Sequence, residues 1–512
     1  MAARSISGDP PRSARTWRTR SAARRAAGPD LSPYRWSAKD FSPHETAGAA
    51  ITSSGIGDYS LSQPVFTSPF RYAKLCALPT NEGLPAMSGH LRIAPLLRTM
   101  ILCLACLFGC NASPGWAADA PVPLLETGKS ADWWFVFKFN TKSFSGCATG
   151  ASRTCLFGGD VQDYSTGYSQ QFVYASNGSP SLKMGNTCLG DTTTDPVGAT
   201  FDQVYNGSYY YVIWNDQFYN DPKLAACHGK DFCEAPWAHS KGMLAWNDDG
   251  DGFVMQVSTP NWPGSGSKQV PPRFNGNTLG CLTDHTGAPK NNVWVSQHFF
   301  ASKLNKSDVI AVLKALQSTS VVTANNSSRN SQSQIVKNGG PAEIQDLVHG
   351  LGKLSEDTTF TKGILSNGVQ LISKPPQFHV PPWQMVSAVL GRAPLTVATW
   401  LTGPRKMPDT EGTRPDCWDS ALNDPGAVIN AETGQWEGTS FGLAGGASAD
   451  RNHAKIGVST ASGSGKYAIF GDLNQEGALS EPCDVPQNTR GGLFFVLEDA
   501  TLSANLRSLL GR

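Results

Sequence analysis

The sequence predicts a mixed α/β fold that contains a duplicated β-hairpin. Short runs rich in aromatic and β-branched residues alternate with clusters of Gly, Asn, Asp and Pro, which is the pattern of strands and turns. Two further segments place apolar residues at helical spacing. A third observation is a unit that occurs at residues 238–261 and again at 452–474: a His-x-Lys strand, a turn, a returning strand and an Asn.

The individual elements follow from these patterns. Strands are predicted where the aromatic and β-branched runs lie, at residues 133–139, 209–214, 252–258 and 466–471. Helices are predicted at about 307–316, with Ser307 as the capping residue, and at about 341–351. The Asn- and Ser-rich tract at 323–334 is expected to be a surface loop between two halves.

The N-terminal region is expected to lie outside the folded domain. Residues 1–86 are rich in Arg, Ser, Pro and Ala without periodicity, so we expect a non-native or disordered extension. Basic residues after Met87, a short apolar run and small residues around Ala117 have the layout of a signal peptide over 87–118. Two explanations remain for the extension, a start codon assigned too early or a disordered segment. The first is favoured, because a signal so far inside a chain would be poorly recognised for export.

Residues 119–512 are therefore expected to be exported, to the periplasm or outside the cell. No later segment approaches 18 uninterrupted apolar residues, so no membrane span is expected. Cys110 lies in a loose match to a lipoprotein cleavage box, which leaves lipid anchoring as the less favoured alternative. Eight cysteines in this region suggest disulfides, and the sequence does not decide their pairing.

The charge balance excludes a broad basic surface for binding nucleic acid. Residues 119–512 contain 29 Lys and Arg against 35 Asp and Glu, a net charge of −6 with His neutral. Proteins that bind polyanions non-specifically carry the opposite balance. If the substrate is a polyanion, binding must use a local cationic site or acidic pH.

The residues that can carry chemistry recur in both hairpins. They are a histidine and a lysine at the start and an asparagine at the end: His239, Lys241 and Asn261, and His453, Lys455 and Asn474. On a strand, residues i and i+2 point to the same face, so each histidine would project beside its lysine. The returning strand would bring each asparagine back to the same end. About 0.3 His-x-Lys matches are expected by chance in this region, so two matched hairpins indicate a functional site.

Several further segments accompany the hairpins. They are VIWNDQ (212–217), AHSKGMLAW and STPNWP (238–246 and 258–263), RPDCWD (414–419), and NHAKIGVS, GDLNQ and RGG (452–459, 471–475 and 490–492). Together they resemble the deoxyribonuclease II family of the phospholipase D-like superfamily, from about residue 133 to residue 495. The resemblance implies a phospholipase D-like α/β fold. Its two pseudo-repeat halves, about 130–322 and 335–512, would each be a sheet flanked by helices and would share one active-site cleft.

The resemblance also implies roles for the hairpin residues. It makes four residues catalytic: His239, Lys241, His453 and Lys455. Asn261 and Asn474 resemble the superfamily's phosphate-binding positions. By analogy His239 is the nucleophile and His453 the general acid and base, although the sequence itself does not order them. Asn452 stands where animal relatives usually carry an acidic residue, which leaves Asp450 as a possible orienting carboxylate.

Such a site suits phosphodiester hydrolysis. One neutral histidine can attack phosphorus to form a phosphohistidine, and the other can protonate the departing 5′-oxygen. Lysines and asparagines would hold the phosphate oxygens, so neither a metal nor another cofactor is expected. We expect an acid endonuclease on DNA that resists chelators and leaves 3′-phosphate and 5′-hydroxyl ends. The family resemblance also suggests that the protein forms a homodimer.

Other residues have two interpretations. Arg490 in RGG either contacts phosphate or caps a loop. Asp216 in WNDQ is more often structural than catalytic at a strand end. The NDDGDG run at 247–252 resembles a calcium loop without its final Glu, and a hairpin turn is favoured. The candidate zinc ligands are Cys227, His228, Cys233 and His239, but their irregular spacing and the expected export favour a disulfide between Cys227 and Cys233.

Two rival functions are left open. The first is a phosphodiesterase of the same fold that acts on lipids or another diester. The second is a non-enzymatic secreted module that binds carbohydrate or surfaces, suggested by the many Trp, Tyr, Gly and Asn residues. The matched hairpins argue against the second function, because a binding module has no need of them.

Overall fold

The computed structural model describes most of the chain after residue 118. The described residues are 119–144, 171–185, 189–190, 193–218, 224–227, 232–262, 294–323, 335–460 and 465–512. The predicted N-terminal extension (1–86) and signal peptide (87–118) lie outside them, as does nearly all of the tract at 323–334. All of the described residues belong to the same compact unit.

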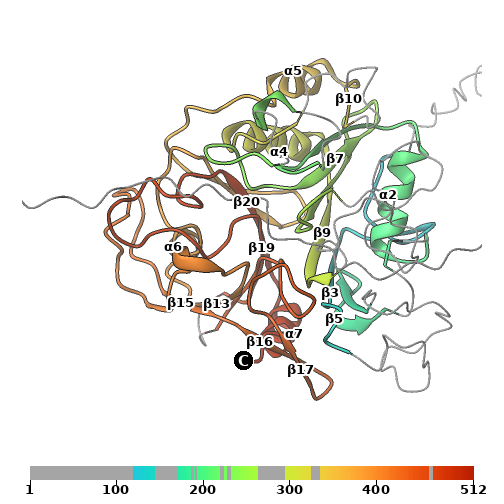
Figure 1. The fold of residues 1–512 in the computed structure, drawn as a ribbon. Coiled ribbons are helices and arrows are strands. Elements are labelled where there is room, and N and C mark those ends of the chain that lie inside the picture. The colour runs from blue at the N-terminus through green and yellow to red at the C-terminus, as the bar shows by residue number, and fades with distance from the viewer. Residues whose placement is uncertain are drawn as a thin grey trace, which may run out of the picture. The chain divides into compact units, whose positions relative to one another are not determined.

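The described residues form a mixed α/β fold with two eight-stranded sheets (Figure 1). The first sheet contains, in spatial order, β10 (Val336–Lys337), β6 (Tyr210–Trp214), β7 (Gly242–Trp246), β8 (Gly252–Val257), β9 (Gln297–Leu304), β3 (Trp133–Lys138), β4 (Phe172–Ser176) and β5 (Ser179–Met184). All neighbouring strands in this sheet are antiparallel. The four predicted strands agree with β3, β6, β8 and, in the second sheet, β19 (Tyr467–Gly471) to within one residue at each end.

The second sheet repeats much of this arrangement. It contains β11 (Thr361–Ile364), β12 (Gln370–Lys374), β20 (Gly492–Glu498), β19 (Tyr467–Gly471), β18 (Ile456–Ser459), β13 (Leu395–Ala398), β15 (Ala427–Asn430) and β14 (Thr410–Glu411). In each sheet a central hairpin, β7–β8 or β18–β19, is followed by a third strand, β9 or β20. Two small hairpins lie apart from these sheets: β1 (Leu124–Glu126) with β2 (Lys129–Ser130), and β16 (Thr433–Trp436) with β17 (Thr439–Gly442).

Five α-helices occur among the described residues: α2 (Pro196–Tyr205), α4 (Lys306–Ser318), α5 (Ala342–Gly350), α6 (Pro382–Val389) and α7 (Ala500–Leu509). Helices α4 and α5 confirm the two predicted helices. The cap of α4 is Asn305, not Ser307 as predicted, because Asn305 and Asp308 exchange side-chain and main-chain hydrogen bonds as a capping box. Ser307 lies in the first turn and donates to Asn305 Oδ1 at 2.7 Å. None of the helices in the described ranges has the length and apolar character needed to cross a bilayer.

Aromatic side chains hold the two sheets face to face. The Phe300 ring in β9 lies 4.6 Å from the Phe470 ring in β19 and 5.6 Å from the Phe495 ring in β20. Phe135 in β3 stacks on Phe470 at 4.7 Å. These four rings are fully buried in one core to which both sheets contribute. The sheets therefore have a fixed relation at the end where both hairpins begin.

Candidate active site

The two His-x-Lys segments lie together between the sheets. The ring centroids of His239 and His453 are 6.4 Å apart. Strand β7 begins at Gly242 and β18 at Ile456, so both segments directly precede their strands. This corrects the prediction that His-x-Lys opens each strand. The reason is that the histidine main chains bond to the opposite sheet, and not to a neighbouring strand of their own sheet.

His239 is held by two carbonyls of the second sheet's loops. Its main-chain N–H donates to Gly491 O at 2.9 Å, just before β20. Its ring Nδ1 lies 3.0 Å from Asp472 O, just after β19. A carbonyl only accepts hydrogen bonds, so Nδ1 carries the hydrogen and the lone pair is on Nε2.

His453 is held in the same way by the first sheet. Its main-chain N–H donates to Ser296 O at 2.8 Å, just before β9. Its Nδ1 faces Ser258 O, just after β8. The Trp400 ring packs edge-on against the imidazole at 4.9 Å. Each histidine is therefore positioned by equivalent carbonyls of the opposite sheet, and the same ring nitrogen, Nε2, is left for chemistry.

Both lysines of the motifs turn back toward their own histidines. Lys241 Nζ lies 3.5 Å from His239 O, and Lys455 Nζ donates to His453 O at 2.8 Å. Lys455 Nζ also lies 3.0 Å from His453 Nδ1, but it does not donate there, because that nitrogen carries the hydrogen that faces Ser258 O. Both side chains are buried. Burial is the largest cause that lowers the pKa of each amine, and the Lys455 pKa falls well below its usual value.

Asp216 is the carboxylate at the centre of the site, although its position at a strand end favoured a structural role. Its Oδ1 accepts from Lys241 Nζ, and its Oδ2 accepts from Arg490 Nη2 at 2.8 Å. The Oδ2 atom also lies 3.9 Å from His239 Nε2. Burial opposes ionisation of Asp216, but the two cations together hold its pKa below the usual value. The carboxylate thus stays charged and orients Lys241.

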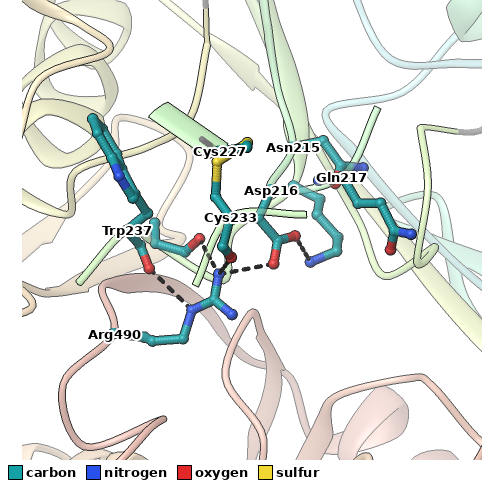
Figure 2. The surroundings of a disulfide bond; sticks show 9 residues. Asn215, Asp216, Gln217, Cys227, Cys233, Trp237 and Arg490 are labelled. Atoms are coloured by element: carbon teal, nitrogen blue, oxygen red, sulfur yellow. Dashed lines mark hydrogen bonds and ion pairs between the residues drawn. A yellow bond between two sulfur atoms is a disulfide. The ribbon is translucent and has the colours of Figure 1, made fainter. Parts of the chain in front are cut away.

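Arg490 caps the loop that precedes β7, one of the two roles left open by the sequence. Its Nε donates to Trp237 O at 3.0 Å, and its Nη2 donates to Cys233 O at 2.8 Å and Ala238 O at 2.9 Å. Figure 2 shows the guanidinium between this loop and Asp216. The alternative role, contact with a phosphate, stays a prediction.

Two disulfides are present among the described residues. Cys227 and Cys233 are bonded, which confirms the favoured interpretation over a zinc site (Figure 2). The Cys233 N–H donates to Asp216 O at 2.8 Å, so this bridge lies beside the central carboxylate. The second bridge joins Cys417 and Cys483. The other four cysteines of the domain are outside the described residues: Cys147, Cys155, Cys188 and Cys281.

Asn261 and Asn474 lie buried after the returning strands, at the same ends as the histidines. Asn474 Nδ2 donates to Glu476 Oε2 at 3.4 Å, and its main-chain N–H donates to Gln487 Oε1 at 3.0 Å. Burial raises the pKa of Glu476. Contact of either asparagine with phosphate stays a prediction.

Hydrogen-bond register identifies Gln475 as a residue that sequence spacing missed. Val257 N–H donates to the carbonyl of Lys241, and Gly471 N–H donates to the carbonyl of Lys455. Four residues beyond these donors stand Asn261 in the first hairpin and Gln475 in the second. Gln475 is fully buried, and both of its amide atoms are without a hydrogen-bond partner within the described part of the chain. Gln475 is therefore a further candidate for substrate contact.

Asp450 does not lie where the sequence hypothesis needs an orienting carboxylate. Asp450 Oδ1 accepts from Ser448 Oγ at 2.7 Å and lies 3.7 Å from Arg451 Nε on the surface, so it does not take the orienting role beside His453. Asn452 instead shapes the segment, because its Oδ1 accepts from Ala454 N–H at 2.9 Å. His453 Nδ1 uses a main-chain carbonyl where a carboxylate was expected.

The NDDGDG run is the turn of the first hairpin, as favoured from the sequence. Asn247 Oδ1 accepts from the N–H groups of Asp249 and Asp251, each at 3.0 Å. Gly250 has a φ of 92°, which suits glycine in a tight turn. Elsewhere in the described ranges, as here, no three His, Cys, Asp or Glu side chains are grouped to hold a metal ion.

The surroundings of both imidazoles favour their neutral forms in the free protein. The pKa of His239 lies well below 6.5 because of burial first, and then because of Lys241, Arg490 and Lys455. The pKa of His453 is likewise lowered by burial and then by the two motif lysines. An anion bound among these cations would raise both pKa values.

Two opposed histidines beside buried cations are groups that can carry acid–base chemistry on an anionic substrate. The family model described as deoxyribonuclease II matches residues 123–511. The chain therefore belongs to the deoxyribonuclease II family and is a deoxyribonuclease, a hydrolase that acts on DNA. A comparison with curated proteins finds no match to the chain.

The charge of Asp216 is expected to be essential to the site. Asp216→Asn leaves Lys241 and Arg490 without their shared anion, so the free energy of unfolding at pH 7 should fall by about 3–5 kcal/mol. Urea denaturation measures this change. Because the Asp216 pKa is depressed, the difference from wild type should shrink only as the pH falls below about 3.8.

The matched control is Asp450→Asn, which removes an exposed pair with Arg451. It should change the free energy of unfolding by about 1 kcal/mol or less. Equal effects of the two substitutions would contradict a central role for Asp216.

Proposed function

We propose that the protein is an exported acid endodeoxyribonuclease whose single active site is formed by His239, Lys241, His453 and Lys455. The observation that carries this proposal is the opposed histidine pair, with ring centroids 6.4 Å apart. Each ring presents Nε2, because carbonyls of the opposite sheet face Nδ1. This spacing suits contact with one phosphoryl group from two sides.

The first step would form a covalent intermediate. The Nε2 lone pair of neutral His239 attacks phosphorus, and the bond from phosphorus to the 5′-oxygen breaks. Protonated His453 gives its proton to that oxygen, which leaves as a 5′-hydroxyl. The phosphoryl group stays attached to the 3′-oxygen and to His239. The choice of nucleophile follows the superfamily analogy.

The second step would release the product. Neutral His453 takes a proton from water as the water oxygen attacks phosphorus, and the bond between phosphorus and His239 breaks. The 3′-phosphate leaves, and His453 is protonated again. Lys241 and Lys455 would stabilise the non-bridging oxygens throughout, with Asn261 and Asn474 as further donors. No metal or other cofactor takes part in this scheme.

The organisation of the whole chain belongs to the same proposal. The fold would be phospholipase D-like, with halves at about 130–322 and 335–512, and the reciprocal bonding of the two histidines supports it. Strand β10, at residues 336–337, pairs with β6 in the first sheet, although the proposed bounds assign these residues to the second half. Export through a signal peptide at 87–118 is supported by the disulfides. Homodimer formation is a further part of the proposal.

Single substitutions should show that both histidines act as one unit. We expect His239→Ala and His453→Ala each to abolish cleavage of plasmid DNA while the protein stays folded. The double variant should be little slower than either single variant, because the effects of residues that act together are not additive. Lys241→Ala and Lys455→Ala should lose about two to four orders of magnitude in kcat.

Circular dichroism provides the folding control for these variants. His349→Ala is the matched variant, since His349 is exposed in the last turn of α5 and has no part in the proposed site. It should keep wild-type activity. Full activity in either His239→Ala or His453→Ala would rule out a shared site.

The pH dependence should be acidic. One histidine must be protonated, and both pKa values in the free protein lie below 6.5. Because protonation is lost as the pH rises, the descending limb of kcat/KM should lie below pH 6.5. A bound phosphodiester raises the histidine pKa, so the descending limb of kcat should lie at higher pH than that of kcat/KM. Initial rates between about pH 4 and 8 test this, and a limb of kcat/KM above pH 7 would exclude it.

Cleavage should survive chelators and leave 3′-phosphate and 5′-hydroxyl ends. Lysine ammonium groups would supply the positive charge that a metal gives elsewhere. The measurement is plasmid digestion with and without EDTA, followed by end-labelling with and without phosphatase treatment. Activity lost in EDTA and restored by magnesium, or 5′-phosphate products, would contradict the mechanism. Cleavage of a lipid diester in place of DNA would favour the rival substrate.

A further inference from the structure

Two buried lysines outside the proposed catalytic group occupy equivalent places in the two sheets. Lys138 is the last residue of β3 and pairs with Gln297, the first residue of β9. Lys374 is the last residue of β12 and pairs with Gly492, the first residue of β20. Both lysines have no exposed surface. Because β9 and β20 each follow the central hairpin of their sheet, the two lysines stand at the same point of a repeated arrangement.

The Lys138 ammonium bonds to the segment that holds His453. Its Nζ donates to Val295 O at 3.0 Å and to Phe139 O at 3.2 Å. The residue after Val295 is Ser296, whose carbonyl accepts the main-chain N–H of His453 at 2.8 Å. Lys138 thus bonds to the carbonyl of Val295, and the carbonyl of the next residue positions His453.

The Lys374 ammonium bonds to the corresponding segment that holds His239. Its Nζ donates to Arg490 O at 3.2 Å and to Asn488 O at 2.6 Å. The residue after Arg490 is Gly491, whose carbonyl accepts the main-chain N–H of His239 at 2.9 Å. Each lysine therefore bonds to the residue two positions before β9 or β20. The next residue in each case accepts the main-chain N–H of the histidine that belongs to the opposite sheet.

We propose that Lys138 and Lys374 are a duplicated pair of positioning residues, each of which fixes the loop that places one histidine of the active site. Lys138 acts on His453, and Lys374 acts on His239. Neither lysine is assigned contact with substrate. The inference rests on the proposed function, because it takes these two histidines as the reacting groups.

The energetic cost of these lysines supports a role beyond folding. A buried ammonium loses its hydration, and burial lowers the pKa of each amine to about 7. Apolar side chains of similar volume often match or exceed the stability of buried ionic groups. An ammonium, however, has three donors and can join carbonyls of two adjacent segments at once. A buried lysine at equivalent places in both sheets is explained if each lysine is needed to fix the geometry of the loop that it bonds to.

The experiment compares Lys138→Met and Lys374→Met in the full-length protein at pH 5. The direct measurement is the imidazole nitrogen NMR spectrum, assigned with His239→Ala and His453→Ala. We expect Lys138→Met to shift the His453 signals and leave those of His239 unchanged, and Lys374→Met to do the reverse. The matched control is Lys362→Met, whose exposed Nζ donates to Val389 O at 3.3 Å. It should shift neither histidine.

Kinetic and thermal measurements separate positioning from stability. Each Met variant should lower kcat on plasmid DNA by about 10- to 100-fold with little change in KM, the scale of a small misplacement of reacting groups. Lys138→Gln and Lys374→Gln keep a neutral donor and should recover part of this loss. The melting temperature at pH 5 should change little in the Met variants, because the removal of a buried charge offsets the loss of its hydrogen bonds to buried carbonyls.

The proposal is overturned by any of three results. These are unchanged imidazole signals in both Met variants, equal shifts of both histidines in each variant, or a Met variant that does not fold, which would assign the lysine to folding. The NMR comparison needs no DNA. If wild type failed to cleave DNA but the selective shifts were observed, the proposed function would fail while the positioning of the histidines stood.

Discussion

The site depends on the hydrogen bonds that each histidine makes to carbonyls of the opposite sheet. His239 uses Gly491 O and Asp472 O, and His453 uses Ser296 O and Ser258 O. Neither sheet alone can position its own histidine, because the acceptors belong to the other. The aromatic core between the sheets is what keeps these acceptors in place. The packing of the two sheets against each other therefore also determines the orientation of both imidazoles.

A second consequence of this interface is a concentration of buried positive charge. Lys241, Lys455 and Arg490 lie near one another, and Asp216 is the carboxylate that bonds to two of them. In the proposed function, this local charge would let a domain with more acidic than basic residues bind DNA. Burial and mutual repulsion lower the pKa values of the histidines, and a bound phosphate would relieve that repulsion. In the proposed mechanism, substrate binding would therefore favour protonation of the histidine that acts as the acid.

Much of the fold was visible as local pattern. Strands β3, β6, β8 and β19 alternate with turn residues as their sequences predict, and α4 and α5 have the expected apolar spacing. Helix α6 was missed because residues 382–388 are all buried, so its polar residues Gln384 and Ser387 do not form the exposed face that marks an amphipathic helix. The cap of α4 was misplaced by two residues, since Asn305 and Ser307 are both residues that favour helix starts. These errors concern elements whose signal is ambiguous without their neighbours.

The sequence by itself determined the family and the two His-x-Lys pairs, because these features depend on residues that are adjacent or within one hairpin. Only the tertiary structure decided how the pairs are held and charged. Asp216 bonds to Arg490, 274 residues away in the chain, and His239 bonds to Asp472, 233 residues away. Lys138 reaches Val295 across 157 residues. Such contacts leave no periodic trace in the sequence, since what brings the partners together is the burial of two sheets against each other.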